Sequence, residues 1–452
     1  MPKILIDIMP AKGHFHATLK IATKLKEEGY DVVYGSHNYL KNEIEKFGFK
    51  FFPLPLLSVV KVTFRVRFSR LHRIATFFYW FISQEKLLKT MGDIQDFQET
   101  IEEIDPDMVL LDEQEVLKSL FYDTDKTKII AFQTKPDTRK INGIPPFTSY
   151  YLPKENIFNK YYCNLLWLLQ LFGYKSSYAI NRFLTFRQDN FSILKQIGKR
   201  LNFNLREKTD INRSFGVGVK NIPRIVISPA GFDFPHPEKE GVFRIGPLIN
   251  IQREGKINQP RYGNLLNRLE SAENDKSFIV YCSLGTVTSK FETVVKKFFK
   301  KISKVAGLNP DCVFIISTGK DFDISELFPA PGNLFIFDYV PQVELLQYCD
   351  LMITHGGMNS ITECIYNNVP MLVYPLSPRW DQPGNSARTV YHGLGLRGRI
   401  KRDSVKSISQ KLNKIKSNYH SYQKNVKAIK DKFEENNNSD QILEIVKSIL
   451  NQ

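Results

Sequence analysis

The sequence predicts an α/β protein of two domains, each built on a parallel β-sheet. The chain has 452 residues, which suits two or three domains, and 42% of them are apolar, enough for real cores. In both halves, short apolar runs alternate with stretches of helical periodicity, and this order places strands in parallel with a ligand crevice at their carboxyl ends. A polar stretch without periodicity, 251–260, separates the halves. We therefore expect domains over 1–250 and 251–452.

The charge and composition of the chain limit the classes of partner that we expect for it. Lys and Arg number 63 against 47 acids, a net charge of +16, which favours phosphorylated ligands, an anionic membrane face or nucleic acid. No nucleic-acid-binding motif is present, so nucleic acid is not expected. The five cysteines have no metal-ligand spacing and are typical of reduced core thiols. Neither a signal peptide nor an apolar run of ~18–20 residues is found, which predicts a cytoplasmic protein, with a peripheral position on the inner membrane face as the alternative.

The N-terminal half begins as a strand, helix, strand, helix series. We expect strands at 3–9 and 31–34, helices at 18–28 and 38–47, and a turn at Gly13-His14 between the first pair. Gly29 ends the first helix. Further strands are expected at 108–112, 224–228 and 242–248, the last of which leads into the linker.

Two titratable residues follow strands in this half. His14 lies just beyond the first strand, in the expected crevice, where an imidazole with a pKa near working pH suits a general base. The alternative is a histidine that only hydrogen-bonds the loop. Asp112 ends the strand MVLLD, where a carboxylate can fix the tautomer of a nearby imidazole. Glu113 is an adjacent competitor, and a solvated strand end is the structural alternative.

In the C-terminal half, strands are expected at 278–283, 313–317, 334–337, 351–354 and 371–374, followed by three helical segments from about 403 to 452. The stretch CDLMITHGGMNSITECIYNNVP organises this half. His355-Gly356-Gly357 forms a turn between a strand and a helix that runs to about 367. Asn359 or Ser360 is expected to cap that helix, with a capping box over 360–363. A helix N-terminus after a glycine turn suits a phosphate group.

The residues around this turn resemble the donor-binding signature of family 1 glycosyltransferases, which have the GT-B fold and use UDP-sugars. The matching pieces come in order within one stretch: YVPQ at 339–342, HGG-x-NS at 355–360, Glu363, Pro370, Pro375, Asp381-Gln382 and Asn385. The resemblance covers the C-terminal half well and the N-terminal half thinly. It implies two Rossmann-like domains that face each other across a cleft, with the last helix returning to the N-terminal domain.

The resemblance also implies a donor site in the C-terminal domain. Tyr339 would stack on the uracil, Val340 and Gln342 would complete the base contacts, and Glu363 would accept from the ribose. The diphosphate would be bound by Ser283, Gly285, Thr286, His355, Gly357, Asn359 and Ser360. Asp381 and Gln382 would bind hydroxyls of the sugar, with helix capping by Asp381 as the alternative.

No cofactor and no metal are expected, because several donors at a helix end can replace a metal. The pattern Asp321-Phe322-Asp323 resembles a metal motif, but it is expected by chance in a chain with 47 acids.

In the family, a histidine at the position of His14 is the catalytic base and an aspartate at that of Asp112 orients it. Gly13-His14 fits this pattern, although Ala17 stands where a proline is usual. The sequence therefore predicts an inverting hexosyltransferase that moves a sugar, with UDP-glucose as the favoured donor, to a hydroxyl of a small apolar natural product. The alternatives are a glycolipid-forming transferase at the membrane surface, a UDP-sugar epimerase and an inactive nucleotide-binding scaffold.

Two stretches rich in basic and aromatic residues, 59–83 and 161–191, fall where the family builds its acceptor pocket. Their composition indicates a large apolar acceptor. Basic residues beside aromatic ones also suit an anionic membrane surface. Ordinary amphipathic helices with aromatic residues in the core are the alternative.

Overall fold

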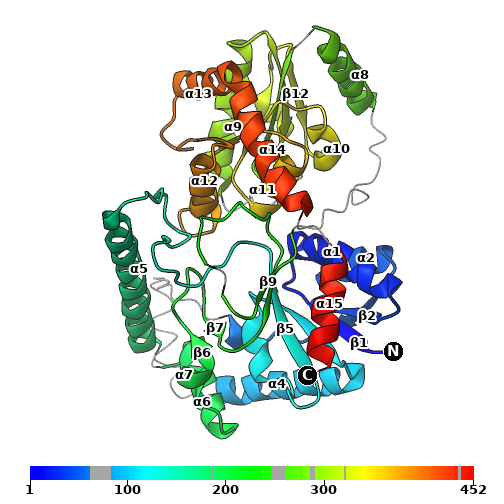
Figure 1. Ribbon diagram of the computed structural model, residues 1–452, viewed down its shortest axis with the longest axis vertical. Coiled ribbons are helices and arrows are strands. Elements are labelled where there is room, and N and C mark those ends of the chain that lie inside the picture. Colours follow the sequence, from blue (N-terminus) through cyan, green and yellow to red (C-terminus); the bar gives the residue numbers. More distant parts are fainter. Residues whose placement is uncertain are drawn as a thin grey trace.

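The computed structural model describes residues 1–61, 83–185, 187–237, 239–246, 260–275, 277–285, 291–319, 322–435 and 439–451. They form two α/β lobes, one above the other in Figure 1. Both large sheets are parallel throughout, so the predicted fold class is confirmed. Most of the predicted linker lies outside the described residues.

The N-terminal lobe is built on a seven-stranded sheet with the order β3-β2-β1-β4-β5-β8-β9. The strands span Lys50–Pro53 (β3), Asp31–Ser36 (β2), Lys3–Asp7 (β1), Met108–Asp112 (β4), Lys128–Gln133 (β5), Arg224–Val226 (β8) and Val242–Arg244 (β9). The central strands β1 and β4 are apolar and buried almost throughout. Sheets with helices on both faces require such strands.

Helices cover both faces of this sheet. One face packs on α1 (Lys12–Glu27), α2 (Lys41–Lys46) and α15 (Ser439–Leu450). The other packs on α4 (Ser83–Ile104) and α6 (Asn190–Arg200). The lobe also contains α5 (Ile157–Leu184), α7 (Leu205–Lys208) and an antiparallel pair, β6 (Thr209–Asp210) and β7 (Gly218–Val219).

Helix α1 starts six residues before the predicted position, at Lys12 instead of 18. The buried stripe explains this, because Phe15 lies one turn before Leu19 and is as deeply buried. Gly13 and His14 are consequently in the first helical turn, and the predicted turn at these residues is wrong.

The C-terminal lobe has a six-stranded sheet with the order β12-β11-β10-β13-β14-β15. The strands span Leu334–Phe337 (β12), Cys312–Ser317 (β11), Phe278–Ser283 (β10), Leu351–Thr354 (β13), Met371–Val373 (β14) and Gly395–Arg397 (β15). The helices are α8 (Pro260–Asp275), α9 (Glu292–Gly307), α10 (Gln342–Leu346), α11 (Met358–Tyr366), α12 (Gln382–Tyr391), α13 (Val405–Ser417) and α14 (Tyr419–Glu435).

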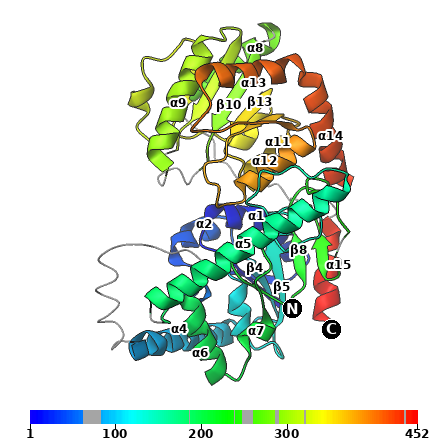
Figure 2. The ribbon, with the colours of Figure 1, turned by 90° about the vertical axis from the view of Figure 1, so that its left-hand side faces the viewer.

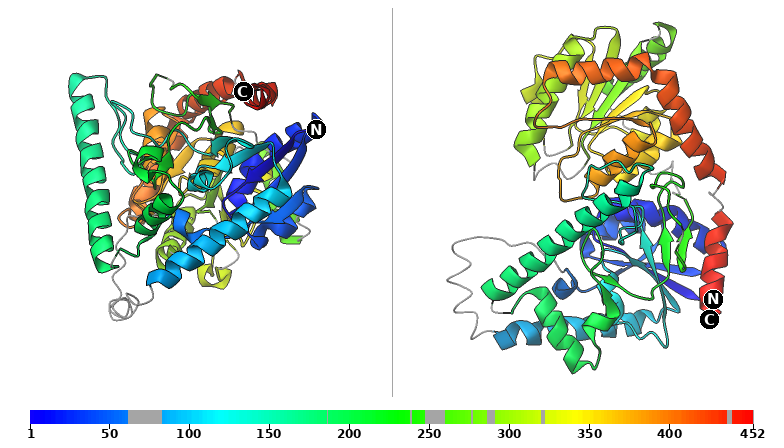
Figure 3. Two further views of the ribbon diagram at one scale, coloured as in Figure 1. Left: turned by 90° about the horizontal axis from the view of Figure 1, so that it is seen from below. Right: turned by 60° about the vertical axis from the view of Figure 1, so that its left-hand side comes forward.

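The end of the chain returns to the first lobe. Helix α14 packs on α11 in the C-terminal lobe, and α15 packs on α1 in the N-terminal lobe. The right-hand view of Figure 3 shows α14 and α15 running down one side of both lobes. Ile442, Val446 and Ile449 belong to the N-terminal core, so the last helix helps to hold the lobes together.

A buried seam also joins the lobes. The guanidinium of Arg388 on α12 contacts the Asp233 carboxylate of the N-terminal lobe, with Nε 2.9 Å from Oδ1. The same group stacks on Phe147 and Phe234, at 3.9 and 4.4 Å from the ring centroids. The backbone N–H of Gly384 donates to the carbonyl of Phe147 at 2.7 Å. These contacts fix how α12 sits on the first lobe.

All five cysteines are buried and unpaired. Among the described residues, no helix has both the length and the apolar content that a membrane crossing requires.

Candidate active site

His14 and Asp112 meet at the carboxyl ends of neighbouring strands. Their side chains form a hydrogen bond of 2.6 Å between His14 Nδ1 and Asp112 Oδ2. Asp112 is the last residue of β4, and His14 lies in the first turn of α1. Because an ionised carboxylate only accepts, Nδ1 carries the proton and Nε2 keeps its lone pair. The imidazole is thus held in the tautomer that a base requires.

Asp112 is buried but ionised. Burial alone would raise its pKa, but the positive charge that His14 carries when protonated and three hydrogen bonds outweigh that effect and lower the pKa below its ordinary value. These bonds come from His14, from Gln114 N at 2.9 Å and from Met9 N at 3.2 Å.

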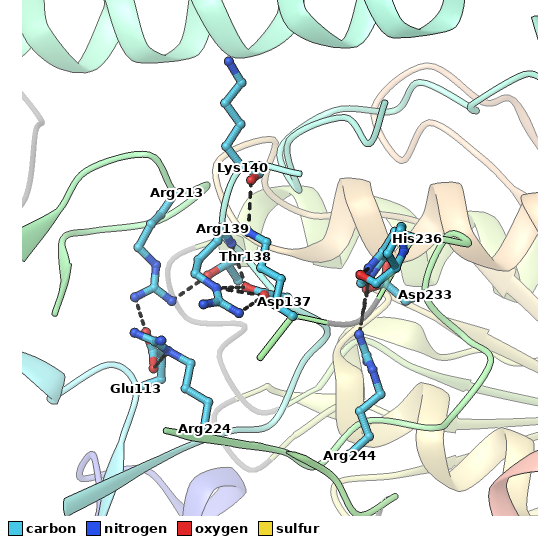
Figure 4. A network of polar contacts seen from close by, with 12 residues as sticks. Glu113, Asp137, Thr138, Arg139, Lys140, Arg213, Arg224, Asp233, His236 and Arg244 are labelled. Atoms are coloured by element: carbon cyan, nitrogen blue, oxygen red, sulfur yellow. Dashed lines mark hydrogen bonds and ion pairs between the residues drawn. The ribbon is translucent and has the colours of Figure 1, made fainter. Parts of the chain in front are cut away.

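Glu113, the other candidate for this role, turns away from His14. Its carboxylate forms ion pairs with Arg213 and Arg224, in the left half of Figure 4. In the same view, Asp233 of the seam lies beside His236 and Arg244. Glu113 therefore joins the end of β4 to Arg213 and to β8, and of the two neighbouring carboxylates it is Asp112 that contacts the imidazole.

Gln114 is a site residue that the sequence reasoning missed. Its Nε2 lies 3.1 Å from Nε2 of His14, so its amide donates to the lone pair. A ligand hydroxyl that hydrogen-bonds to this nitrogen has to displace the amide of Gln114. The available signal was its position two residues after Asp112, at the same strand end.

The predicted glycine turn leads into α11. The helix begins at Met358, and its N-cap is Gly357, which has an extended backbone and makes no side-chain cap. Asn359 and Ser360 lie inside the first turn, so the predicted cap and capping box are wrong. Without a side-chain cap, the first N–H groups of the helix can bind an anion.

His355 is held between two glycines. A Cβ added to Gly285 would lie 2.5 Å from Cε1 of this ring, and a Cβ on Gly357 would lie 2.6 Å from its Nε2. Burial lowers the pKa of His355 to about 4, so the ring is neutral near pH 7. Its Nδ1 is buried without a hydrogen-bond partner among the described residues. A neutral ring with an unused buried nitrogen, next to a helix N-terminus, suits a polar ligand.

The two halves of the site touch each other. Asn359 Nδ2, in the first turn of α11, donates to the carbonyl of Gly13 at 3.2 Å. Gly13 directly precedes His14, so the base candidate and the glycine turn face one another across the two lobes.

Several predicted donor-site residues gather beside α11. Gln342 Nε2 donates to Glu363 Oε2 at 2.5 Å and to Ser360 Oγ at 3.2 Å. Glu363 and Val340 are buried, and Tyr339 is 41% exposed. Tyr339 is therefore partly exposed, and the buried hydrogen-bonding groups begin three residues later in the chain, at Gln342.

Asp381 and Gln382 start α12 on the other side of the turn. Gln382 Oε1 accepts from the N–H groups of Leu376 and Ser377, at 2.8 and 3.1 Å, and holds the loop after β14. Asp381 is at the N-cap position but its side chain caps nothing. Its Oδ2 instead accepts from Asn385 Nδ2 at 3.1 Å, and Asn385 also binds the carbonyl of Gly356. Asn385 therefore ties Asp381 to the glycine turn.

The loop after β10 is described only in part. Ser283 ends the strand in register with Thr354, and Gly285 has a φ of +79°, a left-handed conformation that favours glycine. Thr286 lies outside the described residues, as does Asp321. Asp323 caps a short helix, since its Oδ1 accepts from Ser325 N at 2.9 Å. Among the described residues, no three His, Cys, Asp or Glu side chains gather as a metal site would need.

Of the two stretches predicted to build the acceptor pocket, only the second is described for most of its length. Residues 62–82 of the first lie outside the described residues. Most of the second forms α5, whose Cys163 and Trp167 are buried while many of its apolar side chains are exposed. The alternative, an amphipathic helix whose aromatic residues fill the core, holds for Trp167 but is wrong for other large rings of the helix, since Tyr161, Phe172 and Phe183 are exposed.

A family model matches the chain from the end of the N-terminal lobe through most of the C-terminal lobe. Residues 228–434 match the family model "UDP-glucoronosyl and UDP-glucosyl transferase". Two similar proteins come from Bacillus subtilis (strain 168). The uncharacterized UDP-glucosyltransferase YdhE is 32% identical over 187 residues, 41% of this chain and 44% of that protein. The NDP-glycosyltransferase YjiC is 28% identical over 247 residues, 54% of this chain and 58% of that protein. The chain spans about half the length of these curated relatives.

Solved structures match over the whole chain. The glycotransferase of kitacinnamycin is 18% identical with a TM-score of 0.64, and covers 99% of this chain and 100% of its own. CalG4, the calicheamicin glycosyltransferase, is 15% identical with a TM-score of 0.66, and covers 100% and 99%. These identities show the fold alone. Together with the family match, they confirm the GT-B fold and the resemblance to family 1 that the motifs indicated.

Proposed function

We propose that this chain, which resembles the family 1 UDP-glycosyltransferases in sequence and in fold, is an inverting, metal-independent glycosyltransferase with a UDP-sugar as donor. One observation carries the proposal. The His14–Asp112 pair of the first lobe faces the uncapped N-terminus of α11 in the second, and the Asn359–Gly13 hydrogen bond joins them. A base opposite an anion-binding helix end is the arrangement that a sugar transfer between a hydroxyl and a nucleotide diphosphate requires.

The chemistry follows from these positions. An acceptor hydroxyl replaces Gln114 at His14 Nε2 and gives that nitrogen its proton. The oxygen forms a bond to the anomeric carbon while the bond from that carbon to the diphosphate oxygen breaks, and the electron pair leaves with UDP. Attack from the side opposite the leaving group inverts the anomeric carbon. Asp112 stabilises the imidazolium that forms.

The leaving diphosphate is stabilised by groups that need no metal. The N–H groups at the start of α11, the positive end of its dipole, Asn359, Ser360 and neutral His355 all lie at the glycine turn. A helix end contributes ~0.3–2 kcal/mol for a well-placed charge, and several donors act together. Ser283, Gly285 and Thr286, which end or follow β10 in the sequence, are proposed as further ligands of the same phosphates.

The donor's other parts have candidate partners nearby. Tyr339 offers a ring face to the uracil, with Val340 and Gln342 on the base. Glu363 lies in reach of Gln342 and would accept from the ribose. Asp381 and the Nε2 of Gln382 would bind the sugar, because Oε1 of Gln382 already holds the backbone. UDP-glucose is the favoured donor, and the proposed acceptor is an apolar molecule with a free hydroxyl.

Donor class and base role can be tested separately. Calorimetry with UDP, dTDP and GDP should show a preference for UDP, and equal binding of all three would contradict the proposed donor. Transfer is measured by mass spectrometry of metabolite extracts incubated with the protein and UDP-glucose, as a hexose mass shift on an apolar compound. A free epimerised sugar would indicate the epimerase, and UDP binding without any product would indicate the scaffold.

His14→Ala should bind UDP like the parent and lose transfer by ~10²–10⁴-fold, because only the base is removed. The matched control is His16→Ala, two residues further along α1, where His16 lies 3.5 Å from Glu43 and packs on Phe47. Transfer by His14→Ala at the parent rate would refute the base assignment.

A further inference from the structure

Helix α5 carries an apolar stripe along its outer side. Its members recur at helical spacing and are between 46% and 81% exposed: Phe158, Tyr161, Leu165, Leu168, Phe172 and Phe183. The first five follow one another at intervals of three or four residues, and Phe183 lies three turns further on, beyond Ser176 and Ala179. Single exposed apolar residues are ordinary, but a row of large ones marks an interaction surface. At 1.5 Å per residue the stripe is ~38 Å long.

The side of α5 opposite the stripe is bound to the N-terminal lobe, so the stripe faces away from the lobe. Trp167 and Cys163 are buried, and the indole N–H of Trp167 donates to the carbonyl of Ile144 at 2.8 Å. The hydroxyl of Tyr174 donates to the carbonyl of Ser214 on the same side. Figure 2 shows α5 lying along the outside of the N-terminal lobe, and the left view of Figure 3 shows it at the edge of the molecule. The stripe therefore faces outward while the helix is anchored from behind.

The charge on α5 has one sign. The helix contains Lys160, Lys175 and Arg182, and no acid occurs between Glu155 and Asp189. Lys175 and Arg182 follow Leu168 at intervals of seven residues, so they stand along one edge of the stripe. An outward apolar stripe edged by cations is the pattern of a helix that lies in a membrane interface.

A second copy of the chain fits this surface poorly. A stripe of ~38 Å by ~10 Å offers about 400 Å², half of the ~800 Å² that each partner contributes to a standard interface. Pairing two such helices would also bring cations together with no acid on either helix to compensate. An anionic lipid surface has neither difficulty, and the net charge of +16 favours it.

We propose that α5 is a membrane-docking helix, which lays its apolar stripe into the headgroup region of an anionic bilayer while Lys175 and Arg182 contact lipid phosphates. The attachment is peripheral and holds the N-terminal lobe against the bilayer, where apolar molecules collect. This inference is independent of the transfer chemistry, since it uses no residue of the candidate active site.

Vesicle flotation tests the docking directly. The full chain should float with phosphatidylcholine vesicles that contain about a third phosphatidylglycerol, and bind pure phosphatidylcholine far more weakly. Leu165→Glu/Leu168→Glu should lower binding to the anionic vesicles at least ~10-fold, because two charges would enter the apolar layer. Lys175→Gln/Arg182→Gln should also weaken it, by about 10-fold or more, since each cation near the surface contributes ~1 kcal/mol.

The controls carry the same changes elsewhere on the surface. Leu88→Glu/Leu308→Glu alters two leucines that are 59% and 64% exposed on other elements, and Lys406→Gln/Lys424→Gln removes two exposed cations from α13 and α14. Both should bind vesicles like the parent, and UDP binding should be unchanged in all variants as a check of folding. Failure of the parent to float, equal binding to neutral vesicles, equal binding by the Leu165→Glu/Leu168→Glu variant, or a stripe that only mediates self-association would each overturn the proposal.

Discussion

A single carboxylate decides which nitrogen of His14 is free to take a proton. Asp112 Oδ2 accepts from Nδ1 at 2.6 Å, which leaves the lone pair on Nε2, towards Gln114. The lowered pKa of Asp112 keeps this carboxylate ionised at neutral pH. The same hydrogen bond therefore orients the His14 ring and places a negative charge beside it. Replacing one carboxylate oxygen of residue 112 should thus impair the base without changing the affinity for UDP.

We expect Asp112→Asn to lower transfer by ~10²–10⁴-fold with little change in UDP affinity. An asparagine amide can donate to Nδ1, which moves the ring proton to Nε2 and removes the base. Rates of UDP release and calorimetric affinities for UDP measure the two effects. The control is Asp96→Asn, an exposed aspartate on α4. A variant at residue 112 that transfers sugar like the parent would show that the tautomer is not controlled from this position.

At the scale of elements, the strand–turn–helix unit around α11 depends on two glycines. Neither Gly285 nor Gly357 leaves room for a Cβ beside the His355 ring. Gly285 also has a positive φ, which costs other residues ~1–2 kcal/mol. The buried His355 ring thus fills the space that a side chain at either position would need, and it lies beside the uncapped end of α11.

Gly357→Ala should displace the His355 ring and weaken UDP binding by roughly 10-fold or more, because the added methyl group would lie 2.6 Å from Nε2. Titration calorimetry with UDP measures the loss. Gly263→Ala on α8 is the control, because its new Cβ would meet nothing within 4 Å. UDP binding to Gly357→Ala with parent affinity would exclude a role of this turn in the donor site.

Sequence patterns predicted the two sheets and the strand–turn–helix unit, but they did not predict the details that depend on tertiary packing. Strands 108–112, 278–283, 334–337 and 351–354 were predicted to the residue, because buried parallel strands are short apolar runs between polar turns. The cap of α11 was missed because Asn359 and Ser360 are good caps in isolation, whereas Asn359 instead reaches the other lobe. The sequence did not predict which apolar side chains of α5 are exposed, because an amphipathic pattern does not say which apolar side of a helix is covered.

For the whole molecule, the seam at Arg388 decides how the two halves of the site are held. Arg388 is 1% exposed and pairs with Asp233, a residue 155 positions away. No sequence pattern links the two. Removing one member of a buried pair leaves the other charge uncompensated, which typically costs ~3–5 kcal/mol. The seam is thus a point where one side chain affects both lobes.

We expect Arg388→Met to destabilise the protein by about 3 kcal/mol, while Arg402→Met, an exposed change in the same lobe, has little effect. Adding Asp233→Asn to Arg388→Met should recover part of the loss, because it neutralises the charge left behind. Thermal unfolding of the four proteins measures these differences. Equal stability of the parent and Arg388→Met would show that the pair does not hold the seam.

The same pair predicts how stability changes with pH. Burial would raise the pKa of Asp233, but Arg388, His236 and Arg244 outweigh it and hold that pKa far below the ordinary value. Since the folded pKa is lowered, this contribution is complete above the ordinary aspartate pKa of about 4 and is lost as the pH falls through the range below it. In Arg388→Met the pKa of Asp233 rises, so protonation of Asp233 should cost less stability between pH 5 and pH 2 than in the parent. In the variant that also carries Asp233→Asn, residue 233 does not titrate and should contribute no loss in this range. Unfolding midpoints over that pH range measure the slopes, and parallel curves for all three proteins would contradict the assignment of Asp233 as the charged partner of Arg388.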